Sequence, residues 1–203
     1  MAGVASLIHG SAEPAGRGIT IGTPRVYEAV VSLMFRGRRR AAYRTLLSAS
    51  GAQPGDRVLD VGSGTGYFAR LIARTVGPQG SVEGIDASPE MVAYATRRTR
   101  RLTNCRFQAG TAESLPYPDG RFDVVVSSFV IHHLPADAQV PALREMRRVL
   151  RPGGSLLVAE VPVGNDMGHP APPLGDALTE AGCTDIRPGE VGRWIRFAVG
   201  RSK

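Results

Sequence analysis

The sequence predicts an α/β fold in which seven strands form one doubly wound, mostly parallel sheet with an antiparallel edge strand at the C-terminus. Along most of the chain, apolar strand-like segments alternate with helix-like segments of about 10 to 15 residues, a pattern typical of right-handed βαβ units. FDVVVSSF at 122–129 and SLLVAEV at 155–161 lack polar alternation, as expected of central strands covered on both faces. Together these observations indicate a parallel sheet between two layers of helices.

The individual elements follow in order from Arg57. Besides the two strands above, strands are expected at 57–61, 81–86 and 106–109, and helices at 67–76, 89–101, 136–150 and 174–182. The stretch TDIRPGEVGRWIRFAVG has the pattern of two strands joined by a Pro/Gly turn, which predicts an antiparallel hairpin at the sheet edge. Because no internal repeat or linker is visible, we expect residues 49–203 to form a single compact domain.

The first 48 residues differ in character from the rest. Residues 1–23 are rich in Gly, Ser, Ala and Pro without periodicity, which predicts a mobile arm. A helix is expected from Pro24, since proline suits a first helical turn. An apolar stripe follows at helical spacing, made by Val26, Tyr27, Val30, Leu33 and Met34. RGRRR at 36–40 interrupts the stripe before it resumes over 41–47, so residues 1–48 are expected to form an N-terminal arm and a helical lid.

Length and composition are those of an ordinary globular protein. The chain has 203 residues, enough for one α/β domain, and 42% of them are apolar. No apolar run approaches the ~20 residues that span a bilayer, and MAGVASLIHG lacks the basic region of a secretory signal, so we expect a cytoplasmic protein. Cys105 and Cys183 share no metal-ligand spacing with a histidine, which predicts reduced structural thiols and no metal site.

The charge balance is strongly basic but carries little information about partners. A net charge of +7 and a pI of about 10.2 would suit nucleic acid or an anionic membrane surface. However, Lys203 is the only lysine, and an Arg-, Ala- and Gly-rich composition is also what a GC-rich coding sequence produces. FRGRRRAAYR at 35–44 could contact an anionic membrane, although a solvated basic face explains it more simply.

A glycine-rich loop after the first strand predicts a ligand site. In VLDVGSGTGYFA, residues 58–69, Gly62, Gly64 and Gly66 stand at every second position. A phosphate-binding P-loop would end in Gly-Lys-Ser/Thr, and this loop does not. A dinucleotide fingerprint needs a small residue where Tyr67 stands, so pyrophosphate binding is disfavoured.

Asp86, at the end of the second strand in VEGIDASPEM, indicates which ligand the loop holds. It follows Gly66 by 20 residues, where a carboxylate can accept both hydroxyls of a ribose. Ribose without pyrophosphate fits an adenosyl ligand that carries an amino acid, namely S-adenosylmethionine. The structural alternatives are that Asp60 satisfies turn amides and that Asp86 caps the helix beginning near Pro89.

Four segments resemble the motifs of class I S-adenosylmethionine-dependent methyltransferases, which have a Rossmann-like sheet. They are VLDVGSGTGYFA, VEGIDASPEMV, FQAGTAESLPYPDGRFDVVVSSFVIHHL and LREMRRVLRPGGSLLVAE, and they occur in the family's order across roughly residues 50 to 160. The chain is most similar to the group that includes the ubiquinone/menaquinone-biosynthesis C-methyltransferases and many small-molecule methyltransferases. The resemblance implies methyl transfer from S-adenosylmethionine to a small organic or lipid-like acceptor, at carbon or oxygen, with S-adenosylhomocysteine as the product.

The resemblance also implies roles for individual residues. Asp60 would hold the loop and the ligand's ammonium, and Gly62 and Gly64 would let the methionine part lie against the backbone. Asp86 would hold the ribose. The adenine would meet Ala87, Met91, the backbone N–H of Ala112, and Thr111 where relatives have an aspartate. Ser127 would face the sulfonium through its carbonyl, and the remaining cofactor-loop positions are Ser63 and Gly66.

The acceptor side of the site is expected after the fourth and fifth strands. A histidine there could act as a general base at neutral pH; His133 matches the family best, and His169 is a second catalytic candidate. His132 and Glu160 are expected at the substrate. Because only residues 161–173 separate the fifth strand from the next helix, where relatives insert a long cap, the N-terminal helix would supply the lid, with Tyr27 and Met34 near the acceptor.

Other functions remain open at the level of sequence. SSFVIHHL stands where amino-methylating nucleic-acid enzymes carry an Asn/Asp-Pro-Pro-aromatic motif, and neither cysteine falls where a cytosine C5 enzyme needs its nucleophile. Nucleic acid is therefore a disfavoured partner, although an RNA methyltransferase using the basic surface stays an alternative. A non-catalytic S-adenosylmethionine-binding protein is another, and a nicotinamide oxidoreductase comes last.

Overall fold

A computed structural model describes residues 23–161 and 172–203. Its centre is a seven-stranded sheet in the order β3-β2-β1-β4-β5-β7-β6. The strands are β1 (Arg57–Val61), β2 (Ser81–Asp86), β3 (Cys105–Ala109), β4 (Phe122–Ser128), β5 (Leu150–Glu160), β6 (Thr184–Val191) and β7 (Ile195–Arg201). The first five strands are parallel, and β7 runs antiparallel to both β5 and β6. The predicted doubly wound sheet is confirmed, with the antiparallel strand one position in from the edge that β6 forms.

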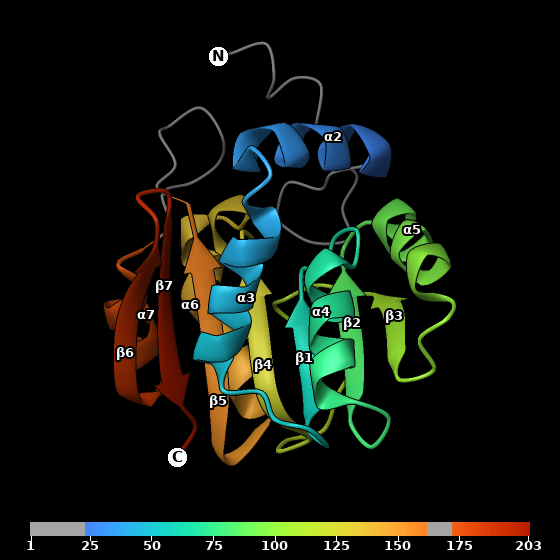
Figure 1. Ribbon diagram of the computed structural model, residues 1–203. Coiled ribbons are helices and arrows are strands. Elements are labelled where there is room, and N and C mark those ends of the chain that lie inside the picture. The colour runs from blue at the N-terminus through green and yellow to red at the C-terminus, as the bar shows by residue number, and fades with distance from the viewer. Residues whose placement is uncertain (1–22, 162–171) are drawn as a thin grey trace.

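Helices cover both faces of this sheet, and one more lies across its upper end (Figure 1). They are α2 (Pro24–Phe35), α3 (Arg39–Ser50), α4 (Tyr67–Val76), α5 (Pro89–Thr99), the 3₁₀ turn η1 (Ile131–His133), α6 (Ala136–Arg148) and α7 (Leu174–Glu180). The predicted helices are all present, and α5, α6 and α7 end two residues earlier than predicted. The predicted interruption of the N-terminal stripe is also present, because Arg36 and Gly37 take left-handed backbone conformations, with φ of 44° and 80°.

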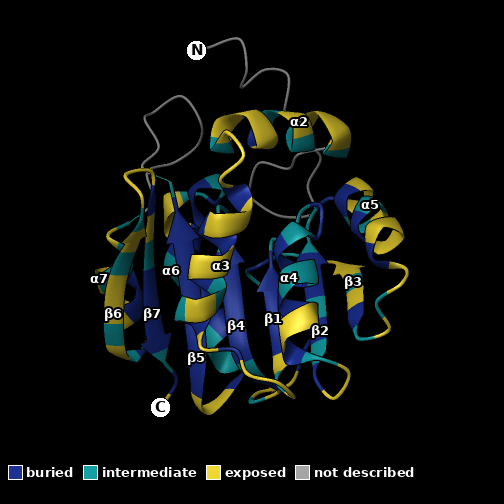
Figure 2. Cartoon of the chain, in the orientation of Figure 1, coloured by how far each residue is buried: buried dark blue, intermediate teal, exposed yellow. Residues whose placement is uncertain are grey.

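The central strands are buried on both faces, which explains their continuous apolar sequence. Val124 and Val126 of β4 pack into an apolar core under α3 and α4, whereas Val125 packs into a second core under α6 and α7. All three are at most 3% exposed, and Figure 2 shows most of β4 and the later part of β5 as buried, whereas residues 151–153, near the start of β5, are exposed. The sheet is therefore held between two separate apolar layers.

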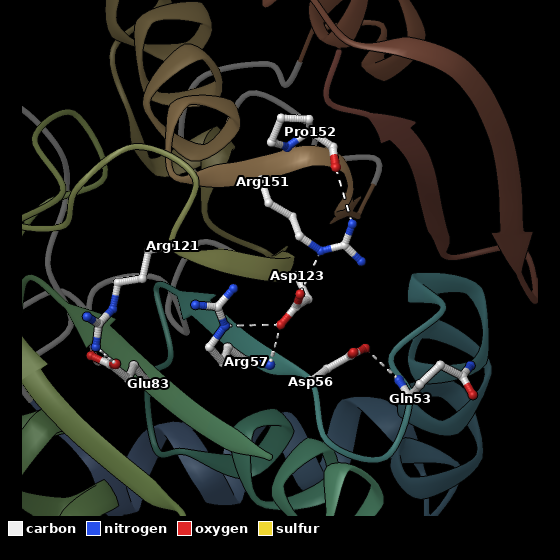
Figure 3. Close-up of polar contacts among 8 residues, drawn as sticks. All are labelled: Gln53, Asp56, Arg57, Glu83, Arg121, Asp123, Arg151 and Pro152. Atoms are coloured by element: carbon white, nitrogen blue, oxygen red, sulfur yellow. Dashed lines mark hydrogen bonds and ion pairs between the residues drawn. The ribbon is translucent and has the colours of Figure 1, made fainter. Parts of the chain in front are cut away.

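At the amino ends of the strands, one carboxylate ties three neighbouring strands together. Asp123 accepts hydrogen bonds from the backbone nitrogen of Arg57 at 2.8 Å and from Nε of Arg151 at 2.6 Å (Figure 3). The β4–β5 register shifts between Phe122 and Val124, so Asp123 lies at an irregularity where ladder hydrogen bonds are interrupted. β5 also begins earlier than predicted, at Leu150, because that residue pairs with Phe122.

Some features bear on the expected environment of the chain. No helix within the described ranges is long and apolar enough to cross a membrane. Cys105 and Cys183 are both buried and free, and burial raises the pKa of the Cys105 thiol to about 12. Among residues 23–161 and 172–203, no group of three His, Cys, Asp or Glu side chains could hold a metal ion.

Candidate functional site

A pocket opens at the carboxyl ends of β1, β2 and β4. Helix α2 lies across this end of the sheet (Figure 1). This is where a doubly wound sheet is expected to bind its ligand, since the strand order reverses between β1 and β4. Its lining residues are Tyr27, Val61, Gly62, Gly64, Ile85, Asp86, Ala87, Met91, Gly110, Thr111, Ala112, Glu113, Ser128, Phe129, Val130, His133 and Leu134.

The glycine loop forms one wall of the pocket, and its glycines serve different purposes. Gly62, Gly64 and Gly66 have φ of 70°, 51° and 71°, a region that favours glycine. A Cβ on Gly62 would lie 2.1 Å from Cγ2 of Val130, whereas a Cβ on Gly64 would meet nothing within 4 Å. Gly62 therefore permits the close approach of the segment after β4, and Gly64 leaves backbone open toward the pocket.

Asp86 is held in place by the loops that surround it. Its Oδ2 accepts from the backbone nitrogen of Gly64 at 2.7 Å, and its Oδ1 accepts from that of Ser88 at 2.9 Å. Burial raises the pKa of this carboxyl, and the two backbone hydrogen bonds oppose that effect. The cap of α5 is Ser88, whose Oγ accepts from the nitrogen of Met91. Each Asp86 oxygen retains capacity for another donor, such as a ribose hydroxyl.

Asp60 lies beneath the same loop and is 1% exposed. Neither of its carboxyl oxygens has a hydrogen-bond partner among the described residues. Burial raises its pKa to about 8, against the opposing effect of the nearby Ala69 amide. A buried carboxyl without a partner is costly, and a ligand ammonium, directly or through water, would supply the missing donor.

Another part of the lining contains apolar side chains that suit a flat ring. Ala87 and the 2%-exposed Met91 lie on one side. Thr111 and Ala112 follow the end of β3, where the nitrogen of Gly110 donates to the Asp86 carbonyl at 3.0 Å. Glu113 also lines the pocket. Glu113 was not among the residues selected from the sequence, although it directly follows Thr111 and Ala112, which were selected.

The segment after β4 closes the site. Phe129 has a left-handed backbone, with φ of 63°, and its nitrogen donates to the Ala159 carbonyl at 2.8 Å. Its ring packs on Phe35 and Tyr43, with centroids 6.3 and 6.1 Å away. His133 follows in η1 and lines the pocket. Nothing in the sequence marked Phe129, because left-handed backbone is uncommon for a bulky residue.

Helix α2 is attached to the glycine loop by a carboxylate. Glu28 accepts a hydrogen bond from the Thr65 hydroxyl and forms an ion pair with Arg39. Both carboxylate oxygens of Glu28 lie 3.0 Å from Nη1 of Arg39. The Arg39 guanidinium stacks on the Tyr67 ring at 3.8 Å. Tyr27, one residue before Glu28, lines the pocket, and burial raises its pKa to about 12. Glu28 was missed because the apolar stripe alone drew attention to this helix.

Several predicted site residues lie beside the pocket and not on its lining. Asp60, Ser63 and Ser127 are buried behind the lining, and Gly66 precedes α4, where its Cβ position is filled by Phe107 and Ala95. Met34, near the far end of α2, is 57% exposed, which gives no support to its predicted place at the acceptor. His132 and Glu160 are buried and contact each other. His169 lies outside the described residues.

Comparisons with known proteins agree with this geometry. Residues 58–154 match the profile of a family described as a methyltransferase domain. The chain is 38% identical over 152 residues to an uncharacterized 37.1 kDa protein in transposon TN4556 of Streptomyces fradiae. This match covers 75% of this chain and 44% of that protein. It is 39% identical over 137 residues to the ubiquinone/menaquinone biosynthesis C-methyltransferase UbiE of Vibrio campbellii, covering 66% and 52% respectively.

The same agreement extends to solved structures. A SAM-dependent methyltransferase from Aquifex aeolicus has a TM-score of 0.68 and 28% sequence identity, and the match covers 79% of this chain and 89% of that one. The chain spans about half the length of the curated relatives it matches. Its strand order, its glycine loop and these likenesses lead to one assignment. Residues 58–154 carry a methyltransferase domain, and in sequence and fold the chain is similar to the class I S-adenosylmethionine-dependent methyltransferases, near their UbiE-like members.

Proposed function

We propose that this chain transfers a methyl group from S-adenosylmethionine to a small organic or lipid-like acceptor, at carbon or oxygen. The observation that carries the proposal is the placement of Asp86, the glycine loop and His133 around one pocket. The likeness to a quinone-biosynthesis C-methyltransferase favours carbon, on an electron-rich ring.

The residues present fit the cofactor at each of its parts. Asp86 accepts the ribose hydroxyls, the carboxyl of Asp60 accepts from the ammonium that supplies its missing donor, and Gly64 exposes backbone to the amino-acid portion. Met91 and Ala87 lie against the adenine. When bound, S-adenosylmethionine supplies an electrophilic methyl group on a sulfonium.

Positioning of the acceptor supplies much of the rate, because an in-line displacement needs no covalent enzyme intermediate. The acceptor lies between His133, Phe129 and Tyr27, under α2. His133 accepts the proton that an acidic O–H or C–H loses as the new bond to the methyl group forms. His169 remains a second candidate for that proton.

The first experiment is calorimetric titration of S-adenosylhomocysteine into protein checked for co-purified ligand. Micromolar binding is expected in the wild type. We expect Asp86→Ala to weaken it at least about 100-fold, since two hydrogen bonds to a charged acceptor are worth roughly 3 kcal/mol. Asp176→Ala, an exposed carboxylate in the first turn of α7, is the matched control and should bind normally.

The same titration contains the result that would overturn the proposal. NADH serves as the competing ligand, and the melting temperature of each variant reports folding. A folded, ligand-free protein that binds no S-adenosylhomocysteine, or that prefers NADH, contradicts the cofactor assignment. Where binding is found, methyl transfer from labelled cofactor to demethylated quinone precursors and small phenols tests the acceptor class.

RNA methylation is a second candidate, favoured by one observation. Arg97, Arg98, Arg100 and Arg101 at the end of α5 and Arg106 on β3 are exposed. None of them forms an ion pair in the part of the chain that the structure describes. RNA binding that weakens steeply with salt would support this candidate, and weak, salt-insensitive binding would count against it.

A further inference from the structure

The last residue of β5 is a buried carboxylate that faces the segment after β4. Glu160 is 3% exposed, and its Oε1 accepts from the backbone nitrogens of Val130 at 3.1 Å and Ile131 at 2.8 Å. Its Oε2 lies 2.5 Å from Nδ1 of His132, which is 4% exposed. Within the described ranges no Arg or Lys pairs with Glu160, so the two amides and the imidazole stabilise its charge.

This contact constrains the proton of His132. An ionised carboxylate can only accept hydrogen bonds, so Nδ1 of His132 carries the proton of the contact. In a neutral imidazole, a proton on Nδ1 leaves Nε2 without one. Glu160 therefore fixes both the ring orientation and the tautomer of His132.

His133 is attached to this arrangement by its backbone and by its ring. Its backbone nitrogen donates to the Val130 carbonyl at 2.9 Å, within the turn that Glu160 holds. Its ring centroid lies 4.1 Å from that of His132, with 42° between the planes. Of the two histidines, His133 lines the pocket and His132 does not. A change at Glu160 thus reaches His133 by two routes.

We infer that Glu160 and His132 form a positioning pair that fixes the orientation of His133 at the pocket, without contacting the methyl acceptor themselves. The inference rests on the proposed function for the role of His133. The pair itself is testable on the full chain without any acceptor. The sequence predicted that His132 and Glu160 contact the substrate. Both instead act from behind the lining of the pocket.

Nitrogen NMR of the full chain labelled at histidine tests the pair directly, because the chain has four histidines. His132→Asn and His133→Gln assign the two signals. The wild type should show His132 protonated at Nδ1 and unprotonated at Nε2. In Glu160→Gln, the side-chain amide becomes a donor toward Nδ1, so His132 should switch to the opposite tautomer and the ring signals of His133 should shift.

Two substitutions at position 132 separate positioning from simple packing. His132→Asn keeps a donor where Nδ1 stands, and it should leave the backbone amide signals of residues 130–133 close to those of the wild type, although the loss of the neighbouring ring shifts the signals of the His133 ring. His132→Phe keeps the ring volume but loses the donor, and it should shift the backbone amide signals of this turn. A residue that only fills space would give the opposite order, since the smaller asparagine leaves a cavity.

Cofactor binding provides an independent reading of the same variants. S-adenosylhomocysteine affinity should change by less than about threefold in Glu160→Gln, because the glutamine oxygen can still accept from the Val130 and Ile131 amides and so keeps the segment beside Gly62 in place. A wild-type His132 protonated at Nε2, or unchanged His133 ring signals in Glu160→Gln together with unchanged backbone amide signals of residues 130–133 in His132→Phe, overturns the inference. Absence of S-adenosylhomocysteine binding in the wild type overturns the proposed function instead, and the tautomer result stands apart from it.

Discussion

The Asp60 carboxyl holds a proton at pH 7 in the ligand-free protein, because burial raises its pKa to about 8. A ligand ammonium placed beside it favours the carboxylate, since an opposite charge nearby lowers the pKa. Binding of S-adenosylhomocysteine at pH 7 is therefore expected to release close to one proton, and Asp60→Asn should abolish that release. Calorimetry in buffers of different ionisation enthalpy measures the number of protons.

Protein stability gives a check on the same carboxyl. Its folded-state pKa is raised from 3.8 to about 8, so the folded protein binds more protons than the unfolded chain between these values. Stability due to Asp60 is then full below pH 4 and is lost as the pH rises toward 8. Denaturant unfolding measures the free energy of unfolding at pH 5 and at pH 8. The decrease between these two pH values should be smaller in Asp60→Asn than in the wild type. Equal losses in both proteins would mean that Asp60 is ionised in the fold.

Gly62 and Gly64 should respond differently to the same substitution. Either alanine is strained by about 1 kcal/mol at a left-handed position, but Gly62→Ala also clashes with Val130, 2.1 Å from Cγ2. Gly62→Ala should therefore lose a further ~1–3 kcal/mol of stability, which Val130→Ala partly restores in the double variant. Gly64→Ala should instead weaken S-adenosylhomocysteine binding with little loss of stability. Unfolding curves and calorimetry decide between these expectations.

Among the elements, α2 depends on few contacts. Val31 is its one buried residue, and much of the helix is exposed (Figure 2). Its polar attachment to the rest of the site is the ion pair of Glu28 with Arg39, whose side chains are 21% and 9% exposed, and the hydrogen bond to Thr65, while Phe35 at its end packs on Tyr43 and Phe129. Such a helix belongs to the less stable parts of a fold, which suits a lid that admits ligands.

Removing the Glu28 charge should loosen this helix selectively. In Glu28→Gln we expect amide hydrogen exchange over 24–35 to accelerate about tenfold or more, equivalent to roughly 1.4 kcal/mol. Peptides from β4 should exchange as in the wild type. Glu180→Gln, at the exposed pair with Arg144, is the control and should change neither region. Equal exchange of α2 in Glu28→Gln and the wild type would show that the ion pair does not hold the helix.

The elements and the cofactor side of the site were predictable because their signals are local. Continuous apolar strands, a glycine loop and Asp86 at a strand end are each visible in a short stretch of sequence. The exposure of Met34 was not predictable, because an apolar stripe on a helix does not show which of its residues face the protein and which face solvent. The pairing of His132 with Glu160 was not either, because it joins residues 28 positions apart through space. The sequence showed both residues near strand ends but not that they contact each other.

Across the whole molecule, the two ends of the sheet are built differently. The carboxyl ends carry the pocket and the loops around it. The amino ends are joined by short charged contacts, in which Asp123 links Arg57 and Arg151, and Arg121 pairs with Glu83 (Figure 3). Rigid support at one end and adaptable loops at the other is the usual arrangement of a binding site on an α/β scaffold.

Asp123 should therefore matter to stability and leave binding unaffected. Burial alone would raise its pKa, but the hydrogen bonds from the Arg57 amide and from Arg151 hold that pKa below its usual range. With a depressed folded-state pKa, its contribution is present above about pH 4 and is lost as the pH falls further. Asp123→Asn should cost about 1–2 kcal/mol at pH 7, flatten the acid side of the stability curve, and leave S-adenosylhomocysteine affinity unchanged. Unfolding curves from pH 3 to pH 7 measure the first two effects, and a loss of affinity as large as that of Asp86→Ala would show that the two ends of the sheet are coupled.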